Sequence, residues 1–343
     1  MFKSSAAALA FILLGLSSLA LSAETIGHVV TMPPPYSSES REISFCYAFA
    51  AATLIDQMLF ESNHSSSKYE PVSMLDLAVN GMGMTEADIS HGREMKTRPT
   101  FDDLGNKYRV LIYAKLKQQL AKESCAPFQR LKILRSSNPS RDADFKALAN
   151  PIAAYNKKRK QNLPVDESVV ADQILAWDPN LNIAKSQIQT SLKNNPMASY
   201  NDFLSFLASI VVPDNCHNSG VSLPNFEVAM VKVDSNNRFQ IPAYLISTLN
   251  RDRPLIWEFC LNDTCTTRHV LVIFGWRNAC DQDKKICQFQ FLLRDSGREI
   301  TDHPGDTWVN ESFISRKLDL MFKNYESLAA KNIIPILILN LEY

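Results

Sequence analysis

Cysteine, histidine and aspartate follow one another in this sequence in an order that suits nucleophilic acyl chemistry. A thiol attacks a carbonyl carbon as the thiolate, and the pKa of a thiol falls at the start of a helix and beside a protonated histidine. Cys46 stands near the start of a segment rich in alanine and leucine, and His269 begins an apolar run. Asp295 follows the next apolar run, where a carboxylate would orient the imidazole through its second ring nitrogen. These residues are the candidate nucleophile, base and orienting group.

The segments around these residues predict a helix for the thiol and strands for the other two. Residues 45–60 contain no glycine or proline, which predicts a buried helix, and Ser44 as N-cap would place Cys46 in its first turn. After residue 225 the pattern changes to β-branched or aromatic runs bounded by turn residues, at 226–233, 254–259, 269–276, 289–293 and 336–339. Helices followed by strands predict an α+β fold with two segregated lobes.

Five segments resemble those of papain-like cysteine peptidases, in the order that the family carries them. Residues 44–50 (SFCYAFA) are similar to the motif in which an aromatic residue, Ala and Phe follow the catalytic cysteine. Residues 71–77 loosely resemble the family's Leu-Ser-Glu-Gln-x-Leu-Val-Asp segment. Further matches are the Gly-Pro-Val strand at 253–257, His-Ala-Val-x-x-Val-Gly-Tyr at 269–276 and Lys-Asn-Ser-Trp-Gly at 293–297. The resemblance covers about residues 40–80 and 250–315.

The resemblance implies a two-lobe papain-like fold and a cysteine-type peptidase. Cys46 would form an acyl-enzyme with a peptide or protein substrate, His269 would act as base and Asp295 would orient it. The backbone amide of Cys46 would contribute to an oxyanion hole. This chemistry needs no metal or cofactor, and the sequence shows no metal-ligand spacing.

Three positions depart from the family pattern. The family has a Gln six residues before its cysteine that stabilises the oxyanion, whereas this chain has Ser40, which is a candidate for that role. Asp295 replaces the family's Asn, and Gly297 replaces the Trp that shields the His–Asn contact. Trp308, further along the chain, is a candidate to cover the site instead.

The spacing between nucleophile and base predicts a large insertion. His269 lies 269 − 46 = 223 residues after Cys46, against about 130 in papain-like enzymes, which leaves roughly 90 extra residues. The expected division is a signal peptide at 1–23, an N-terminal helical lobe with the nucleophile helix at 24–84, a mainly helical insertion or extension at 85–220 and a β lobe at 221–343. Only 46 − 23 − 1 = 22 residues separate Ala23 from Cys46, so no family-like pro-segment is expected.

The N-terminus and the cysteines indicate export. Lys3, an apolar run and small residues ending at Ala23 have the layout of a secretory signal peptide, which leads to the periplasm or outside the cell, with no membrane span after its removal. Seven cysteines leave one thiol unpaired, and if that thiol is Cys46, six others form three bridges. Proximity favours Cys260–Cys265 and Cys280–Cys287, which leaves Cys125–Cys216 by elimination. The formal net charge of zero gives no indication of nucleic-acid binding, and the oligomeric state stays open.

Each candidate residue also has a plainer interpretation. Cys46 could be an inert buried thiol, His269 a satisfied residue at a strand end and Asp295 a turn former. The remaining histidines show no paired spacing and are interpreted as surface residues: His28, His64, His91, His217 and His303. Two alternative functions follow, a catalytically silent papain-fold binding protein and a transglutaminase-like acyltransferase that uses Cys, His and Asp.

Overall fold

The structure of the chain is a computed structural model that combines helices with an antiparallel sheet. It describes residues 27–33, 45–62, 69–81, 107–128, 138–181, 183–194, 206, 209–234, 236–265, 268–281, 286–295, 305–329 and 336–343. The proposed signal peptide, at residues 1–23, lies outside these ranges. The expected mixture of helices and antiparallel strands is confirmed.

The helices and strands have the following bounds. The helices are α2 (Cys46–Ser62), α3 (Met74–Gly81), α5 (Lys107–Lys117), α7 (Asn138–Lys160), α8 (Glu167–Trp177), α9 (Lys185–Asn194), α11 (Asp214–Asn218), α12 (Ile241–Leu249) and α13 (Glu311–Ala329), with short 3-10 turns η2 (Pro179–Leu181) and η3 (Arg238–Gln240). The strands are β1 (Gly27–Val29), β2 (Gln119–Leu120), β3 (Val221–Ser222), β4 (Glu227–Val233), β5 (Leu255–Cys260), β6 (Arg268–Asp281), β7 (Ile286–Asp295), β8 (Gly305–Asn310) and β9 (Ile336–Glu342).

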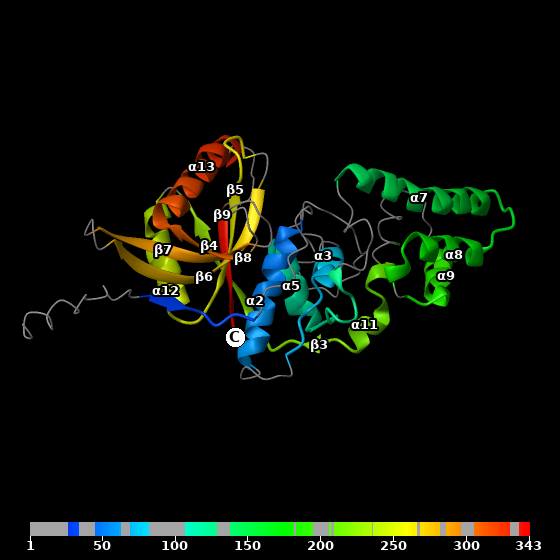
Figure 1. Cartoon of the computed structure of the whole chain (residues 1–343), viewed down its shortest axis with the longest axis horizontal. Coiled ribbons are helices and arrows are strands. Elements are labelled where there is room, and N and C mark those ends of the chain that lie inside the picture. The colour runs from blue at the N-terminus through cyan, green and yellow to red at the C-terminus, as the bar shows by residue number, and fades with distance from the viewer. Residues whose placement is uncertain are drawn as a thin grey trace, which may run out of the picture.

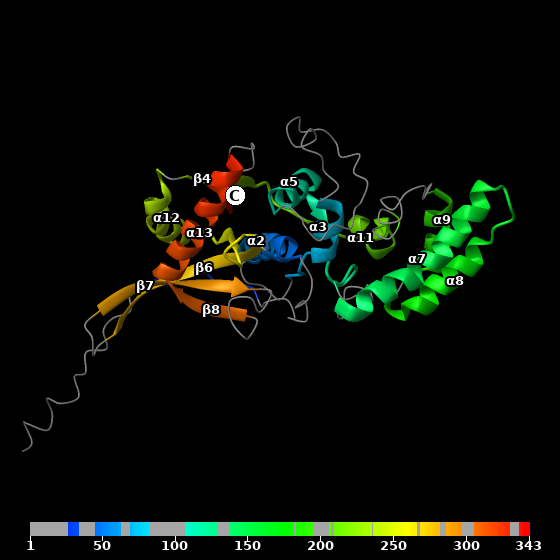
Figure 2. The ribbon, with the colours of Figure 1, turned by 90° about the horizontal axis from the view of Figure 1, so that it is seen from above.

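The elements follow one another along the long axis of the molecule (Figure 1). The large sheet lies at one end with α12 and α13 packed on it, and α2 stands beside it. Next come α3 and α5, and α7, α8 and α9 occupy the far end, an order that the view from above repeats (Figure 2). Among the described residues, no helix has both the length and the apolar character that crossing a membrane would need.

The sheet has seven antiparallel strands in the order β4-β9-β5-β6-β7-β8, with β1 paired to β6. β6 is the longest strand, and it pairs with β5 along its first part and with β1 further on. Gly27 is required where β1 pairs with β6, because a Cβ there would lie 2.5 Å from the carbonyl oxygen of Trp276. The β5–β6 and β6–β7 pairings bring the start of β6 and the end of β7 to the same region of the sheet.

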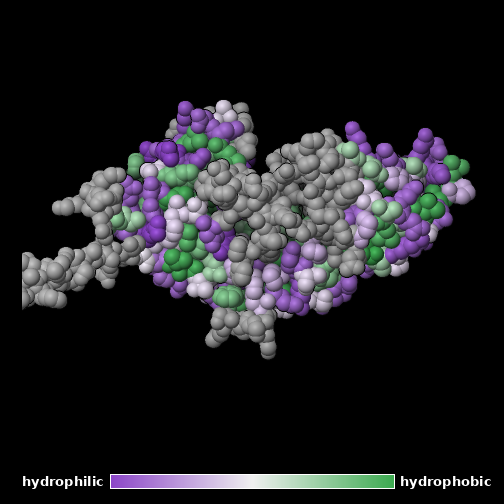
Figure 3. Space-filling model, in the orientation of Figure 1, coloured by the Kyte–Doolittle hydropathy of each residue, from purple (hydrophilic) through white to green (hydrophobic). Residues whose placement is uncertain are grey.

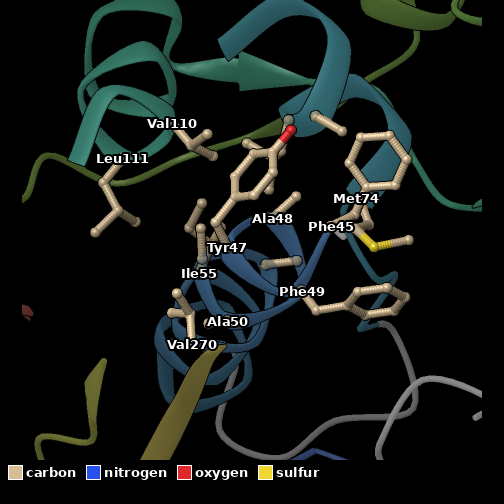
Figure 4. Packing of buried hydrophobic residues seen from close by; sticks show 14 of the residues in the cluster. Phe45, Tyr47, Ala48, Phe49, Ala50, Ile55, Met74, Val110, Leu111 and Val270 are labelled. Atoms are coloured by element: carbon tan, nitrogen blue, oxygen red, sulfur yellow. The ribbon is translucent and has the colours of Figure 1, made fainter. Parts of the chain in front are cut away.

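Helix α2 forms the centre of the hydrophobic core. Every residue from Tyr47 to Leu59 is buried, so the helix has no solvent face, as its composition predicts. Figure 4 shows Tyr47 directed toward Val110 and Leu111 of α5, and Val270 of β6 beside Ala50 of α2. The helix therefore joins the helical part of the molecule to the sheet.

A buried carboxylate, Asp76 of α3, joins several neighbouring elements. It accepts hydrogen bonds from the hydroxyl of Tyr113 (2.9 Å), the amide of Asn80 (2.7 Å) and the backbone N–H of Ala121 (2.8 Å), and its Oδ1 lies 3.0 Å from Nε2 of His217. Burial raises the pKa of Asp76, but its bonds to His217, Asn80 and Ala121 and the charge of His217 lower it more, so the net shift is downward. His217 is thus not the surface residue that its isolated position in the sequence suggested.

We expect Asp76→Ala to lower the free energy of unfolding by about 3–5 kcal/mol, because it leaves several buried donors without an acceptor. Stability should also depend on Asp76 ionisation: a carboxyl whose folded pKa is lowered stabilises above its unfolded pKa, near 4, and loses that contribution as the pH falls. Urea unfolding at pH 7 and pH 3 measures both effects. Asp172→Ala, at an exposed ion pair with Lys185, is the matched control and should change stability little.

The stretch 85–220, expected as an insertion or extension, contains two kinds of helix. Helix α5 packs against α2 and α3, and β2 pairs with β3. Helices α7, α8 and α9 instead pack on one another away from the sheet (Figure 2). Hydrophilic and hydrophobic residues are interspersed on their visible surface (Figure 3). The helices of this stretch that lie farthest from the sheet are therefore α7, α8 and α9.

Three disulfides are present: Cys125–Cys216, Cys260–Cys265 and Cys280–Cys287. They are the pairs expected from proximity and elimination. The Cα–Cα distances of these bridges are 5.6, 4.8 and 4.0 Å respectively. The paired cysteines lie 91, 5 and 7 positions apart in the sequence. Cys46 is the one free thiol among the seven cysteines. Disulfides persist in oxidising compartments, which agrees with an exported protein.

Candidate active site

Cys46 is the first residue of α2 and is half-buried. The carbonyl of Phe45 accepts hydrogen bonds from the N–H groups of Ala48 (2.9 Å) and Phe49 (3.1 Å), so Phe45 occupies the N-cap position that the sequence suggested for Ser44. Ser44 lies outside the described residues. The first N–H groups of a helix lack intrahelical acceptors, so Cys46 lies where backbone donors of α2 are available.

Aromatic packing fixes this end of the helix. Phe45 is 1% exposed, and its ring lies 6.0 Å from Tyr47 and 6.1 Å from Phe128 between centroids. Phe49 meets the same Phe128 ring at 5.1 Å. Figure 4 shows Phe45 and Phe49 on the side of α2 near Met74, and Tyr47 on a different side. The rings on both sides of Cys46 in the chain are thus buried, which restricts where the sulfur can point.

His269 and Asp295 come together at the ends of two neighbouring strands. His269 is the second residue of β6, and Asp295 is the last residue of β7. The Nε2 atom of His269 lies 2.6 Å from Oδ1 of Asp295, and both residues are only 3% exposed. Cys46 also hydrogen-bonds to the side chain of His269. With Nε2 engaged by Asp295, Nδ1 is the ring nitrogen that remains for the sulfur. The structure therefore brings all three candidate residues into one chain of contacts.

The partners of His269 favour its protonated form. Burial lowers the pKa of His269, but hydrogen bonds with Asp295 and Cys46 and the negative charges of both groups raise it to about 10 from 6.5. The contacts with Asp295 on one side and Cys46 on the other therefore both favour the imidazolium form of His269.

Phe259 packs against His269. The pairing of β5 with β6 places it directly opposite His269, and its ring meets the imidazole edge-to-face at 5.8 Å and 82°. Phe259 is fully buried. The sequence signal was available, because Phe259 ends a predicted strand, but only the register identifies it as the histidine's neighbour.

Trp308 does not cover the site, contrary to the expectation from the sequence. It pairs with Leu292 across β7 and β8, whereas Asp295 pairs with Gly305. Side chains alternate along a strand, so Trp308 and Asp295 face opposite sides of the sheet. The Trp308 ring instead stacks under the guanidinium of Arg277 at 4.2 Å.

The remaining predicted site residues are placed as follows. Ser40 and Gly297 lie outside the described residues. The six disulfide cysteines are bonded as expected, so they cannot act as nucleophiles. Nε2 of His28, on β1, lies 2.9 Å from Oδ1 of Asp252 and away from the candidate site, with a side chain that is 34% exposed.

Sequence reasoning missed an ionic group beside His269. Glu258 on β5 forms an ion pair with Lys107, the first residue of α5, and accepts a hydrogen bond from Arg268 at 3.0 Å. Burial raises the pKa of Glu258, but Lys107 and Arg268 lower it by more. The net shift is therefore downward, which favours the charged carboxylate. Arg268 immediately precedes His269.

Comparisons with known proteins give low overall similarity. No protein-family model matches the chain, and no curated protein sequence does so either. A structure described as recombinant stem bromelain precursor is similar with a TM-score of 0.40 and 10% identity, over 90% of this chain and 66% of that one. The SERA5 proenzyme from Plasmodium falciparum is similar with a TM-score of 0.35 and 13% identity, over 79% and 57% respectively. The chain thus spans less than two thirds of either structure.

Proposed function

We propose that the chain is an exported cysteine peptidase with a two-lobe papain-like fold. The observation that carries the proposal is the chain of contacts from Cys46 at the start of a buried helix, through His269, to the buried carboxylate of Asp295. A nucleophile, a base and a group that orients the base, each within hydrogen-bond reach of the next, are the parts that nucleophilic acyl transfer requires. Helices α7, α8 and α9 would then form an insertion between the two lobes' sequences.

In the proposed reaction, the thiolate of Cys46 attacks the carbonyl carbon of a peptide bond. The backbone N–H of Cys46 stabilises the resulting oxyanion, with Ser40 as a second candidate donor. The imidazolium of His269 gives its proton to the leaving amine, and the C–N bond breaks to leave a thioester on Cys46. Neutral His269 then takes a proton from water, which attacks the thioester and releases the acid. Asp295 holds the imidazole in position throughout and stabilises its charged form.

Incubation with a mixed library of internally quenched peptides tests this proposal, with mass spectrometry to identify the products. We expect peptide cleavage by the disulfide-intact protein and a loss of at least about 100-fold in Cys46→Ala, which keeps the helix but removes the nucleophile. Inclusion of a primary amine distinguishes a peptidase from an acyltransferase, because an acyltransferase would yield the amide of that amine as its main product. A wild-type protein that binds library peptides without cleaving or transferring them would contradict the proposal and favour a silent binding protein.

Export forms part of the same proposal. The three disulfides support an oxidising compartment, so we propose the periplasm or the exterior of the cell. Fractionation of cells that express the full chain, with the mass of the mature N-terminus, would test removal of residues 1–23. A chain that stays reduced in the cytosol would contradict this part.

A further inference from the structure

The turn between α7 and α8 lies at the end of the molecule opposite the sheet (Figures 1 and 2). The backbone N–H groups of Gln161, Asn162 and Leu163 donate to carbonyls in the last turn of α7, and Asn162 has a φ of 53°. Bonds of this kind, with a left-handed residue just past the helix, close a helix end and fix the direction of the chain that follows. The turn is therefore a defined part of the surface.

An arginine brings the end of α9 to the same place. Arg159, in the last turn of α7, donates hydrogen bonds to the carbonyls of Leu192 (3.1 Å) and Lys193 (2.9 Å) in the last turn of α9. The ends of α7 and α9 and the start of α8 thus form one end of the three-helix group. This end is the helical tip, and its exposed charged and apolar residues are Lys157, Lys158, Arg159, Lys160, Leu163, Asp166, Val169 and Lys193.

The helical tip carries a local positive charge. Five cations lie in the last turns of α7 and α9, and two carboxylates, Asp166 and Glu167, lie at the start of α8, so the formal charge is 5 − 2 = +3. Both carboxylates are engaged within the tip: Asp166 accepts from the backbone N–H of Ser168 (2.8 Å), and Glu167 from the hydroxyl of Tyr155 (3.2 Å). The whole chain has a formal net charge of zero, so positive charge is concentrated here.

Two apolar side chains project from the same tip. Leu163, in the turn, is 49% exposed, and Val169, in the first turn of α8, is 51% exposed. Figure 3 shows hydrophobic residues beside hydrophilic ones at this end of the molecule. Transfer of exposed leucine and valine from water to an apolar medium is favourable. The tip therefore combines apolar side chains with long, flexible cations.

We propose that the helical tip docks the protein on a membrane surface that carries anionic lipids. Leu163 and Val169 enter the boundary between headgroups and acyl chains, and the lysine ammonium groups bind the lipid phosphates. A lysine suits this position because its apolar stem lies along the hydrocarbon while its charged end reaches the headgroups. The tip contains none of the candidate catalytic residues, so this inference goes beyond the proposed peptidase and does not depend on it.

The shape of the tip favours a membrane over an acidic protein as the partner. A stable protein interface buries about 1,200–2,000 Å² of total surface across complementary faces. The tip is instead the projecting end of three helices, joined by a short turn (Figure 2). A projecting end with two apolar side chains and a surrounding group of lysines can enter a fluid surface without a shaped partner.

Sedimentation with large unilamellar vesicles tests the inference. The vesicles consist of phosphatidylcholine alone or with about 30% phosphatidylglycerol, which supplies the anionic surface. The exported, disulfide-intact protein is used after its mass shows that residues 1–23 are removed, because that apolar segment would itself bind lipid. We expect binding to the anionic vesicles that weakens between about 0.1 M and about 0.5 M salt, and at least about 100-fold weaker binding to neutral vesicles.

Substitution of the lysines measures the electrostatic part. The triple variant Lys157→Gln, Lys158→Gln, Lys160→Gln should bind anionic vesicles about 100-fold more weakly, because each lysine near such a surface contributes roughly fivefold. A matched control removes the same charge from exposed lysines on α5, β4 and α13, away from the tip, and should bind within about twofold of the wild type because salt screens distant charges. These control positions are Lys117, Lys232 and Lys323.

A second variant measures the apolar part at constant charge. Leu163→Ser combined with Val169→Ser should weaken binding to anionic vesicles about tenfold, because the side chains that enter the membrane become polar. Both positions are exposed, and thermal unfolding of every variant checks that it is folded.

The outcomes decide between the partners. A wild type that fails to bind anionic vesicles at low salt, or tip and control variants that bind equally, would overturn the inference. Binding to soluble polyglutamate that depends on the tip lysines, without binding to vesicles, would assign the tip to an acidic protein instead of a membrane. Peptide cleavage by the wild type would be unaffected by any of these results, so failure of this inference is distinguishable from failure of the proposed function.

Discussion

Alkylation of Cys46 by iodoacetamide is expected to remain fast at pH 6 in the wild type and to fall about 100-fold at that pH in His269→Ala. The pKa of His269 is raised to about 10, so its imidazolium persists through neutral pH and can hold a thiolate beside it. An ordinary thiol, by contrast, is ionised in roughly one molecule in 300 at pH 6. Mass spectrometry after labelling between pH 5 and pH 9 measures the rate. The other six cysteines are in disulfides, so the label reports Cys46 alone.

A second histidine with a carboxylate partner provides the matched control. His217 lies 3.0 Å from the buried Asp76, and it belongs to α11 rather than to the sheet. Its replacement by Ala should leave the pH dependence of labelling unchanged. A wild-type rate that rises only near pH 8.5, with no effect of His269→Ala, would contradict a thiolate–imidazolium pair. The chain would then be a scaffold that binds without catalysis.

The candidate site was predictable because each of its residues stands at the end of an element with a strong local signal. An alanine-rich helix and β-branched strands are recognisable from composition, and their ends fix where Cys46, His269 and Asp295 lie along the chain. The structure describes a helix that begins at Cys46 and a strand that ends at Asp295. The disulfides followed from the same reasoning, since two of the pairs are close in sequence and the third had no other partners.

Contacts between distant segments were not predictable. His217 and Asp76 are 141 residues apart, and Lys107 and Glu258 are 151 apart, so neither pair leaves a periodic or spacing signal. The packing of Phe259 against His269 was missed for a related reason. It depends on the register of β5 and β6, which composition does not specify.

Helix α13 was missed although its signal was available. Ile314, Leu318, Met321 and Phe322 are buried, and their spacing of four, seven and eight residues from Ile314 is that of an amphipathic helix. The segment lies among strands, so the local pattern was outweighed by the β character of its surroundings. Helix α12 likewise lies between two strands in the chain, β4 and β5. Both helices cover the sheet and thereby bury the strands that carry the site.

Replacement of Asp295 should separate its role in orientation from its role in charge. Asn at this position, as in the family that the sequence resembles, keeps a hydrogen-bond acceptor for Nε2 of His269 but removes the negative charge. We expect Asp295→Asn to retain more peptide hydrolysis near pH 7 than Asp295→Ala, because the amide oxygen can still orient the ring. The alkaline limb of its pH–rate profile should move down by about one to two pH units, since the lost carboxylate no longer raises the pKa of His269.

Asp295→Ala removes both contributions and should lower hydrolysis by at least about 100-fold. The two variants differ in the orienting bond alone, since both lack the charge, and they leave Cys46 and its helix unchanged. The pH dependence of kcat/KM between pH 5 and pH 10 for wild type and both variants is the measurement. Because a histidine whose pKa is raised stays charged up to the raised value, removal of the carboxylate narrows the pH range of activity from its alkaline side. Equal losses in the Asn and Ala variants, with no shift of the alkaline limb, would mean that Asp295 only fills space at the end of β7.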